Sequence, residues 1–214
     1  MKNLRLKQVG QITDANLGFG DLTVMVGPQA SGKSIALQWL KLVGDTGLIQ
    51  SQLDAYGLDY GADLPLFLDT YFGEGMRSIW HAGSSVEVDG KVVDVAKRIG
   101  RRQPGKKESV FMIPAQRVLA LPNGWPRPFQ SYSPGDPYAV RAFSEQLRKL
   151  MEREFTGTRA LFPKNNRLKI DYRTLLQQSV FADFKLSVDK VQSQKRLVLT
   201  AGGGNLPFMV WSAG

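Results

Sequence analysis

The chain has 214 residues, of which 43% are hydrophobic and 22% are charged, so it is large enough for one substantial globular domain. It contains no cysteine and one histidine, His81, which excludes disulfide scaffolds, thiol catalysis and clustered imidazole or thiolate metal centres. The 28 basic and 19 acidic residues give a net charge of +9. That charge is typical of proteins with anionic partners, such as nucleotides or nucleic acid, but it also serves solubility.

The N-terminal segment MKNLRLKQVGQITD has neither the apolar stretch nor the cleavage site of a secretory leader. No apolar run approaches the ~18 residues of a membrane span. We therefore expect a cytoplasmic protein with no membrane partner.

Alternating apolar residues at 4–9 and 12–17 predict two short, paired strands. The continuous run LTVMV at 22–26 predicts a strand buried on both faces. The segment SIALQWLKLV at 34–43 has apolar residues near helical spacing, and Gly44 is expected to end that helix. The order is therefore strand, glycine loop, helix.

Residues 45–108 are expected to form an irregular insertion on the core. Within it, Asp89-Gly90 lies between β-branched residues and predicts a hairpin at 85–95. Six basic residues and no acidic residue follow at 97–107. A mobile, solvated loop is the simplest interpretation of this stretch; contact with nucleic-acid phosphates is the alternative, although no aromatic residues are interleaved there.

A second buried strand is predicted at 109–113, and an amphipathic helix at 138–155. A shorter helix is predicted at 171–181, followed by strands around 186–191, 197–199 and 208–210. The predicted organisation is a single domain, 1–214, with these parts: core 1–44 and 109–118, insertion 45–108, helical region 138–181 and closing strands 185–214.

The segment GPQASGKS fits the pattern G-x-x-x-x-G-K-[ST] at every specified position, and it lies between a predicted strand and a predicted helix. Backbone N–H groups and a helix N-terminus can hold a phosphate there, while glycine permits close approach. Lys33 would direct a charge at the β- and γ-phosphates, and the Ser34 hydroxyl would bind Mg²⁺. We predict nucleotide binding through Gly27, Pro28, Gln29, Ala30, Ser31, Gly32, Lys33 and Ser34. The alternative is a glycine turn with an accidental lysine.

Hydrolysis also needs an acidic residue at the end of another strand to organise magnesium. Asp69 follows the apolar run LPLFL, but Pro65 argues against a central strand. A surface or capping carboxylate is the other interpretation of Asp69.

The short strands before the GPQASGKS loop, the long insertion, the segment IPAQR and the closing hairpin into 211–214 together resemble the N-terminal part of an ABC-type ATPase head. The pattern is most similar to the SMC, RecF and overcoming-lysogenisation-defect groups. This resemblance implies an α/β fold, a P-loop NTPase of ABC-head type, with a mixed sheet, an antiparallel N-terminal subdomain and a helical insertion.

The family's signature, S-x-G-Q, contacts the γ-phosphate of a nucleotide held by the opposite subunit, and Ser212-Ala213-Gly214 matches its first three positions. A small-residue terminus is the alternative. Gln116 or Arg117 lies where the family places the glutamine that senses magnesium and the attacking water; the alternative is that either side chain satisfies loop carbonyls. The resemblance thus implies catalytic roles for Lys33 and Gln116 and magnesium ligation by Ser34 and Gln116.

The function implied by the resemblance is ATP·Mg²⁺ binding, with hydrolysis when a missing C-terminal part or a second subunit completes the site. ATP is expected rather than GTP because the sequence also lacks a convincing N-K-x-D guanine motif. The resemblance implies a homodimer of the longer protein that acts with DNA or a nuclease in DNA maintenance or defence. Two alternatives remain: a non-hydrolysing, nucleotide-gated assembly module, and a kinase-like or GTPase-like protein that uses Asp69. We expect residues 1–214 alone to bind nucleotide, to turn it over slowly or undetectably, and to be largely monomeric.

Overall fold

The computed structural model describes residues 1–105, 107–122, 124–154, 178, 184–191, 194–201 and 203–207. The chain divides into two compact units, which are described separately. The first comprises Met1–Ala115 and Phe129–Phe143, and the second comprises Gln116–Pro128 and Ser144–Gly214.

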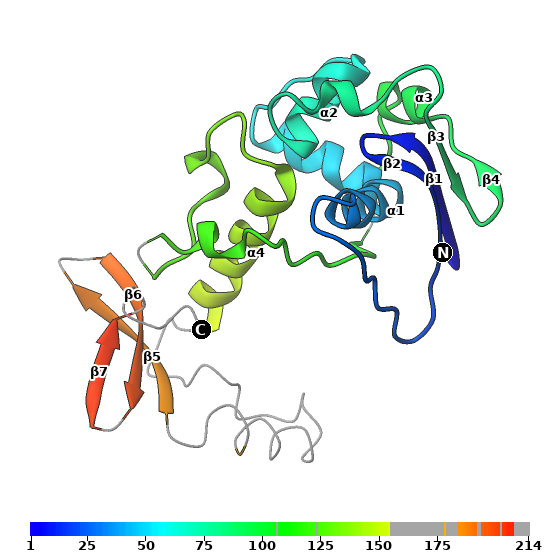
Figure 1. The fold of residues 1–214 in the computed structure, drawn as a ribbon. Coiled ribbons are helices and arrows are strands. Elements are labelled where there is room, and N and C mark those ends of the chain that lie inside the picture. The colour runs from blue at the N-terminus through cyan, green and yellow to red at the C-terminus, as the bar shows by residue number, and fades with distance from the viewer. Residues whose placement is uncertain are drawn as a thin grey trace. The chain divides into compact units, whose positions relative to one another are not determined.

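The first unit contains a four-stranded antiparallel sheet in the order β2-β1-β3-β4 (Figure 1). Its strands are β1 (Asn3–Val9), β2 (Ile12–Gly18), β3 (Ser85–Val88) and β4 (Lys91–Val92). Asp89 and Gly90 join β3 to β4 with φ angles of 49° and 77°, as a two-residue turn between strands requires. Both hairpins predicted from the sequence are therefore confirmed.

The core of this unit lies between the sheet and helix α1 (Lys33–Ala55). Leu4, Leu6 and Val9 alternate with more exposed residues along β1 and are fully buried. Trp39 of α1 is also fully buried, so one face of the sheet and one face of the helix share an apolar core.

Helix α1 continues past Gly44, where the sequence predicted its end. Asp45 departs from helical geometry (φ −126°, ψ 27°), and a second helical stretch follows directly. Ile49 and Leu53 on that stretch are fully buried, which explains why the helix continues. Gly44 instead lets the side chain of Val110 pack closely against α1, because a Cβ at this position would lie 3.1 Å from Cγ2 of Val110. The predicted helix end is therefore wrong.

Three further α-helices are described: α2 (Leu64–Phe72), α3 (Val95–Gly100) and α4 (Tyr138–Glu154). The carboxylate of Asp63 caps α2 by accepting from the N–H of Leu66, and Pro65 lies in the first turn, where proline is tolerated. Asp94 caps α3 in the same way. Helix α4 confirms the amphipathic helix predicted at 138–155.

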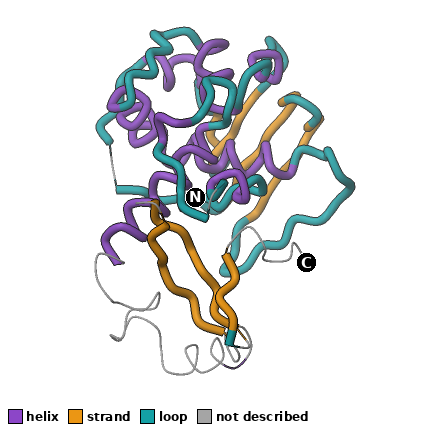
Figure 2. The backbone as a smooth tube through the Cα atoms, turned by 90° about the vertical axis from the view of Figure 1, so that its left-hand side faces the viewer, coloured by secondary structure: helices purple, strands orange, loops and turns teal. Residues whose placement is uncertain are grey.

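Neither of the two buried strands predicted from continuous apolar runs is formed. Residues 22–26 and 109–113 are extended loop, and Figure 2 shows no strand between β2 and α1. Leu22, Val24 and Val26 are 85%, 71% and 87% exposed. A strand exists only when its backbone pairs with a neighbour, and among the described residues neither segment has one. The run of apolar residues showed β-propensity but could not show the partner.

The second unit contains an antiparallel sheet in the order β5-β6-β7. Its strands are β5 (Phe184–Val191), β6 (Gln194–Ala201) and β7 (Gly204–Pro207). They confirm the strands predicted around 186–191 and 197–199. The predicted strand at 208–210 lies outside the described residues, as does the predicted helix at 171–181 apart from Gln178.

Both sheets in the described part of the chain are antiparallel, so these residues do not form the mixed sheet expected around the glycine loop. Among the residues the structure describes, no helix combines the length and the apolarity needed to span a bilayer.

Candidate phosphate-binding loop

Residues 27–31 form an exposed loop that leads through the buried Gly32 directly into α1. Ala30 and Gly32 have φ angles of 61° and 88°, in the left-handed region. A Cβ on Gly32 would lie 2.5 Å from Cγ1 of Ile12, so only glycine fits at this position. The loop therefore has two residues in the left-handed region and leads into a helix, as the motif predicted, but the strand expected before it is not formed.

The first turn of α1 presents unsatisfied backbone donors. Gly32 occupies the N-cap position, yet no side chain caps the helix and its first turn contains no acidic residue. The N–H groups at the start of a helix have no acceptor within the helix and carry its positive dipole end. The exposed hydroxyl of Ser34 lies in the same turn. This arrangement suits an anion with an associated cation.

The ammonium of Lys33 folds back over the loop. Its Nζ donates to the carbonyl oxygens of Gly27 (2.9 Å) and Pro28 (2.5 Å) and to Oγ of Ser31 (3.1 Å). A positive charge is thereby held at the loop itself. The loop, the helix N-terminus and the lysine, which the sequence predicted as one site, lie together.

In the structure, Asp69 binds Arg77. Asp69 is 8% exposed on α2, and its carboxylate accepts from the backbone N–H of Arg77 (2.7 Å) and from Nε of Arg77 (2.7 Å). A guanidinium NH2 of Arg77 also lies 2.5 Å from the same carboxylate. Asp69 thus fixes the short 3-10 helix Met76–Ile79 to α2, which agrees with the capping interpretation.

Of the residues implied by the family resemblance, the structure describes Gln116 and Arg117 but not Ser212. Gln116 is exposed and begins the second unit, whereas the glycine loop belongs to the first. Arg117 is exposed and starts a 3-10 helix, Arg117–Ala120. Ser212 lies outside the described residues. The roles of Gln116 and Ser212 therefore stay predictions.

The sequence analysis missed a buried charge network on α1, the helix that follows the glycine loop. Nζ of Lys41 lies 2.7 Å from Oδ2 of Asp45 and 2.5 Å from Oε1 of Glu108. The other oxygen of Asp45 accepts from the N–H of Ser109 (2.8 Å), and Oδ2 also accepts from the N–H of Val110 (3.0 Å). The only sequence signal was the i,i+4 spacing of Lys41 and Asp45, which the expected helix end at Gly44 concealed.

Burial alone would raise the pKa of the Asp45 carboxyl. The hydrogen bonds from Lys41, Ser109 and Val110 outweigh it and hold that pKa below its ordinary value. Asp45 is therefore a charged anchor that fastens segment 108–110 to α1.

The single histidine takes part in a turn. Nδ1 of His81 accepts from the N–H of Gly83 at 3.2 Å, while the neighbouring Trp80 packs against Trp39 with ring centroids 5.3 Å apart. Within the described ranges, no three acidic or histidine side chains are grouped as metal ligands would be.

Comparison with known proteins adds no relative to this description. The chain matches no protein-family model and no curated protein, and its structure matches no solved structure. The candidate site is therefore defined by its own residues.

Proposed function

We propose that residues 27–34 bind the phosphates of ATP together with Mg²⁺. The observation that carries the proposal is the eight-residue motif placed at the start of α1, with the Lys33 ammonium held over the loop. Gly32 lets the end of the loop pack against Ile12, since a Cβ there would collide with that side chain. The preference for ATP over GTP rests on the resemblance to ABC-type ATPases.

The residues present fit such a ligand. Free N–H donors and the positive end of the α1 dipole face the loop, and they favour an anion. Lys33 adds a full charge that can pair with terminal phosphate oxygens. Ser34 offers a hydroxyl oxygen, a hard ligand of the kind Mg²⁺ accepts alongside water and phosphate. Bound Mg²⁺ would neutralise charge on the phosphates.

The experiment is calorimetric titration of the chain with Mg·ATP. Lys33→Ala removes the charge at the loop, and Lys149→Ala removes an equal charge from an exposed site on α4. We expect affinity to fall at least tenfold in Lys33→Ala, the loss of about one charge-assisted hydrogen bond, and to stay unchanged in Lys149→Ala. Ser34→Ala should weaken binding with Mg²⁺ more than without it.

Equal affinity of the wild type and Lys33→Ala would refute the proposal. Far-ultraviolet circular dichroism of each variant separates loss of binding from loss of fold. For the complete protein we propose ATP hydrolysis, on the family resemblance alone. For residues 1–214 by themselves we propose nucleotide binding.

A further inference from the structure

The Lys33 ammonium is bound by the same loop whose ligand it is expected to hold. An ammonium group has three N–H donors and no acceptor. Its Nζ donates to three oxygens of the loop, the carbonyls of Gly27 (2.9 Å) and Pro28 (2.5 Å) and Oγ of Ser31 (3.1 Å). The ammonium therefore has as many acceptors within the loop as it has donors.

These contacts also fix the direction of two peptide groups. The carbonyl oxygens of Gly27 and Pro28 face the ammonium, so the side of the loop next to Lys33 carries the negative ends of those peptide dipoles. A phosphate is held by backbone N–H groups and is repelled by carbonyl oxygens. A phosphate oxygen can therefore accept a hydrogen bond from Lys33 only if the ammonium leaves one of its present acceptors.

Ser31 is the partner of Lys33 that a side-chain substitution can remove. The other two acceptors are backbone carbonyls, which every residue type retains. Within the described part of the chain, the Ser31 hydroxyl makes no hydrogen bond other than the one from Lys33. The structure thus gives this side chain one contact, and that contact is with the lysine.

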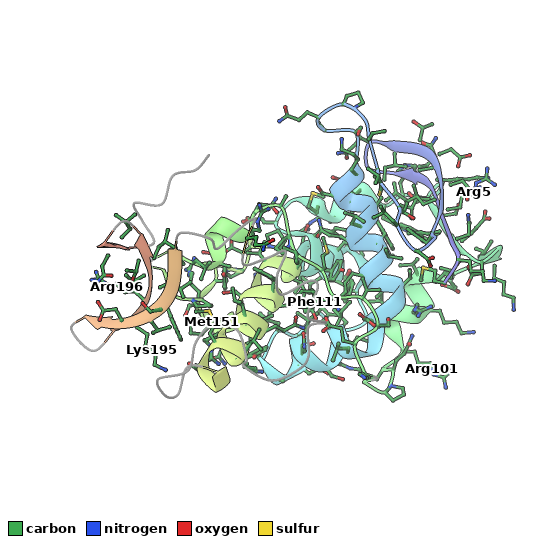
Figure 3. The ribbon with its side chains drawn as sticks, turned by 90° about the horizontal axis from the view of Figure 1, so that it is seen from below. Arg5, Arg101, Phe111, Met151, Lys195 and Arg196 are labelled. Atoms are coloured by element: carbon green, nitrogen blue, oxygen red, sulfur yellow. The ribbon has the colours of Figure 1, made fainter. Side chains whose placement is uncertain are left out.

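The loop is placed where it can change conformation. Residues 27–31 are exposed, and Figure 3 shows the loop projecting from the start of α1 at the edge of the first unit. Ala30 has a φ of 61°, which residues other than glycine rarely adopt. Such a backbone conformation persists only where surrounding contacts determine it. The three hydrogen bonds of Lys33 are contacts of that kind.

We propose that Ser31 restrains Lys33 in a closed loop, from which the ammonium must be released before it pairs with a terminal phosphate. Ser31 is then a positioning residue that acts through Lys33, and it does not bind phosphate itself. The proposal rests on phosphate binding by residues 27–34. Hydrogen bonds between charged groups are about twice as strong as those with a neutral partner, so the oxygens of a polyphosphate can displace the loop acceptors.

The direction of the expected effect follows from the equilibrium between the closed and open loop. A ligand that binds only the open loop has an affinity reduced by the fraction of molecules that are closed. Removing the Ser31 acceptor should raise the open fraction and so tighten binding. If Ser31 bound phosphate directly, its removal would weaken binding instead.

The test is calorimetric titration of the chain with inorganic tripolyphosphate, which has neither base nor ribose. We expect Ser31→Ala to bind about three- to tenfold more tightly than wild type, as the loss of one competing hydrogen bond predicts. Ser31→Thr keeps the hydroxyl and should match the wild type. In the Lys33→Ala background, Ser31→Ala should have no effect, because its action passes through the lysine.

Stopped-flow kinetics provide a readout that a purely structural role of Ser31 would not change in this way. The gain in Ser31→Ala should lie in the association rate, with the dissociation rate unchanged, because the open loop is the same in both proteins. Thermal unfolding of each variant shows whether it is folded.

Weaker or unchanged binding by Ser31→Ala would overturn the proposal, and so would an equal gain in the Lys33→Ala background. A gain confined to the dissociation rate would place the effect of Ser31 in the bound state and would also refute it. The two proposals fail in different ways. Equal tripolyphosphate binding by wild type and Lys33→Ala contradicts phosphate binding by the loop, whereas binding that depends on Lys33 but gains nothing in Ser31→Ala contradicts only the closed loop.

Discussion

The ammonium of Lys41 lies 2.7 Å from the carboxylate of Asp45, one helical turn along α1, and both side chains are almost completely buried. Buried charges are tolerated only when they are paired and hydrogen-bonded, and removing one partner leaves the other uncompensated. Asp45 is also the residue at which the α1 backbone is irregular, and its carboxylate accepts hydrogen bonds from the N–H groups of Ser109 and Val110. It fastens a segment 64 residues away to the kink of α1.

The first prediction concerns acid stability. Because the folded-state pKa of Asp45 is below its ordinary value of 3.8, its ionisation stabilises the fold above that pH. This contribution should be lost as the pH falls below 3.8 and through the lower folded pKa. Asp45→Asn should cost about 3 kcal/mol at neutral pH, as breaking a buried pair does, and the difference from wild type should shrink below pH 4.

Urea unfolding at a series of pH values measures both effects. Asp21→Asn, which alters an exposed carboxylate before the glycine loop, is the matched control and should follow the wild type. A difference between Asp45→Asn and wild type that is the same at every pH would contradict the assignment.

The second prediction concerns Gly47. Alanine in place of glycine inside a helix ordinarily stabilises it by about 0.5–1 kcal/mol. At position 47 the new Cβ would overlap the Pro104 carbonyl, which is backbone and cannot rotate away. We therefore expect Gly47→Ala to destabilise the protein by about 1–3 kcal/mol, the usual range for overpacking.

Thermal unfolding checks this, and Gly20→Ala is the control because a Cβ there meets nothing within 4 Å. A stabilised Gly47→Ala would show that the Pro104 segment does not lie against α1.

The elements predicted correctly from the sequence depend on neighbours close along the chain. The hairpins β1-β2 and β3-β4 follow from alternating residues and a two-residue turn, and α4 follows from its apolar spacing. The glycine loop was found because its residue types are fixed by local geometry, as the positive φ of Gly32 shows.

The wrong predictions depend on distant contacts. Gly44 was interpreted as a helix end, but its missing side chain leaves room for Val110, which lies 66 residues further on. Residues 22–26 and 109–113 have strand composition, yet whether a strand forms depends on a backbone partner that composition cannot reveal. Gln50 gave no signal at all, because its role exists only once Ile99, Arg101 and Gln103 are folded against α1.

The third prediction separates Asp69 from magnesium. Its carboxylate is occupied by Arg77, so Asp69→Asn should leave the affinity for Mg·ATP unchanged. The free energy of unfolding should fall by about 1 kcal/mol, because an amide oxygen can still accept from the Arg77 N–H while the partly exposed ion pair is lost. Calorimetric titration with and without Mg²⁺ measures the first quantity, and urea unfolding measures the second.

A selective loss of Mg²⁺-dependent affinity in Asp69→Asn would contradict this prediction. It would support the kinase-like or GTPase-like interpretation, in which Asp69 lies beside Ser34.

The last prediction concerns turnover by residues 1–214. Phosphoryl transfer depends on charges that position Mg²⁺ and the attacking water around the γ-phosphate. The loop provides Lys33 and Ser34, but Asp69, the acid that the sequence suggested for magnesium, is committed to Arg77. We therefore expect nucleotide binding with slow or undetectable hydrolysis. Steady-state phosphate release, with Lys33→Ala as the blank, measures it. Rapid turnover that depends on Lys33 would show that these residues already supply the missing acid, and the comparison with an ABC-type head would be the first interpretation to abandon.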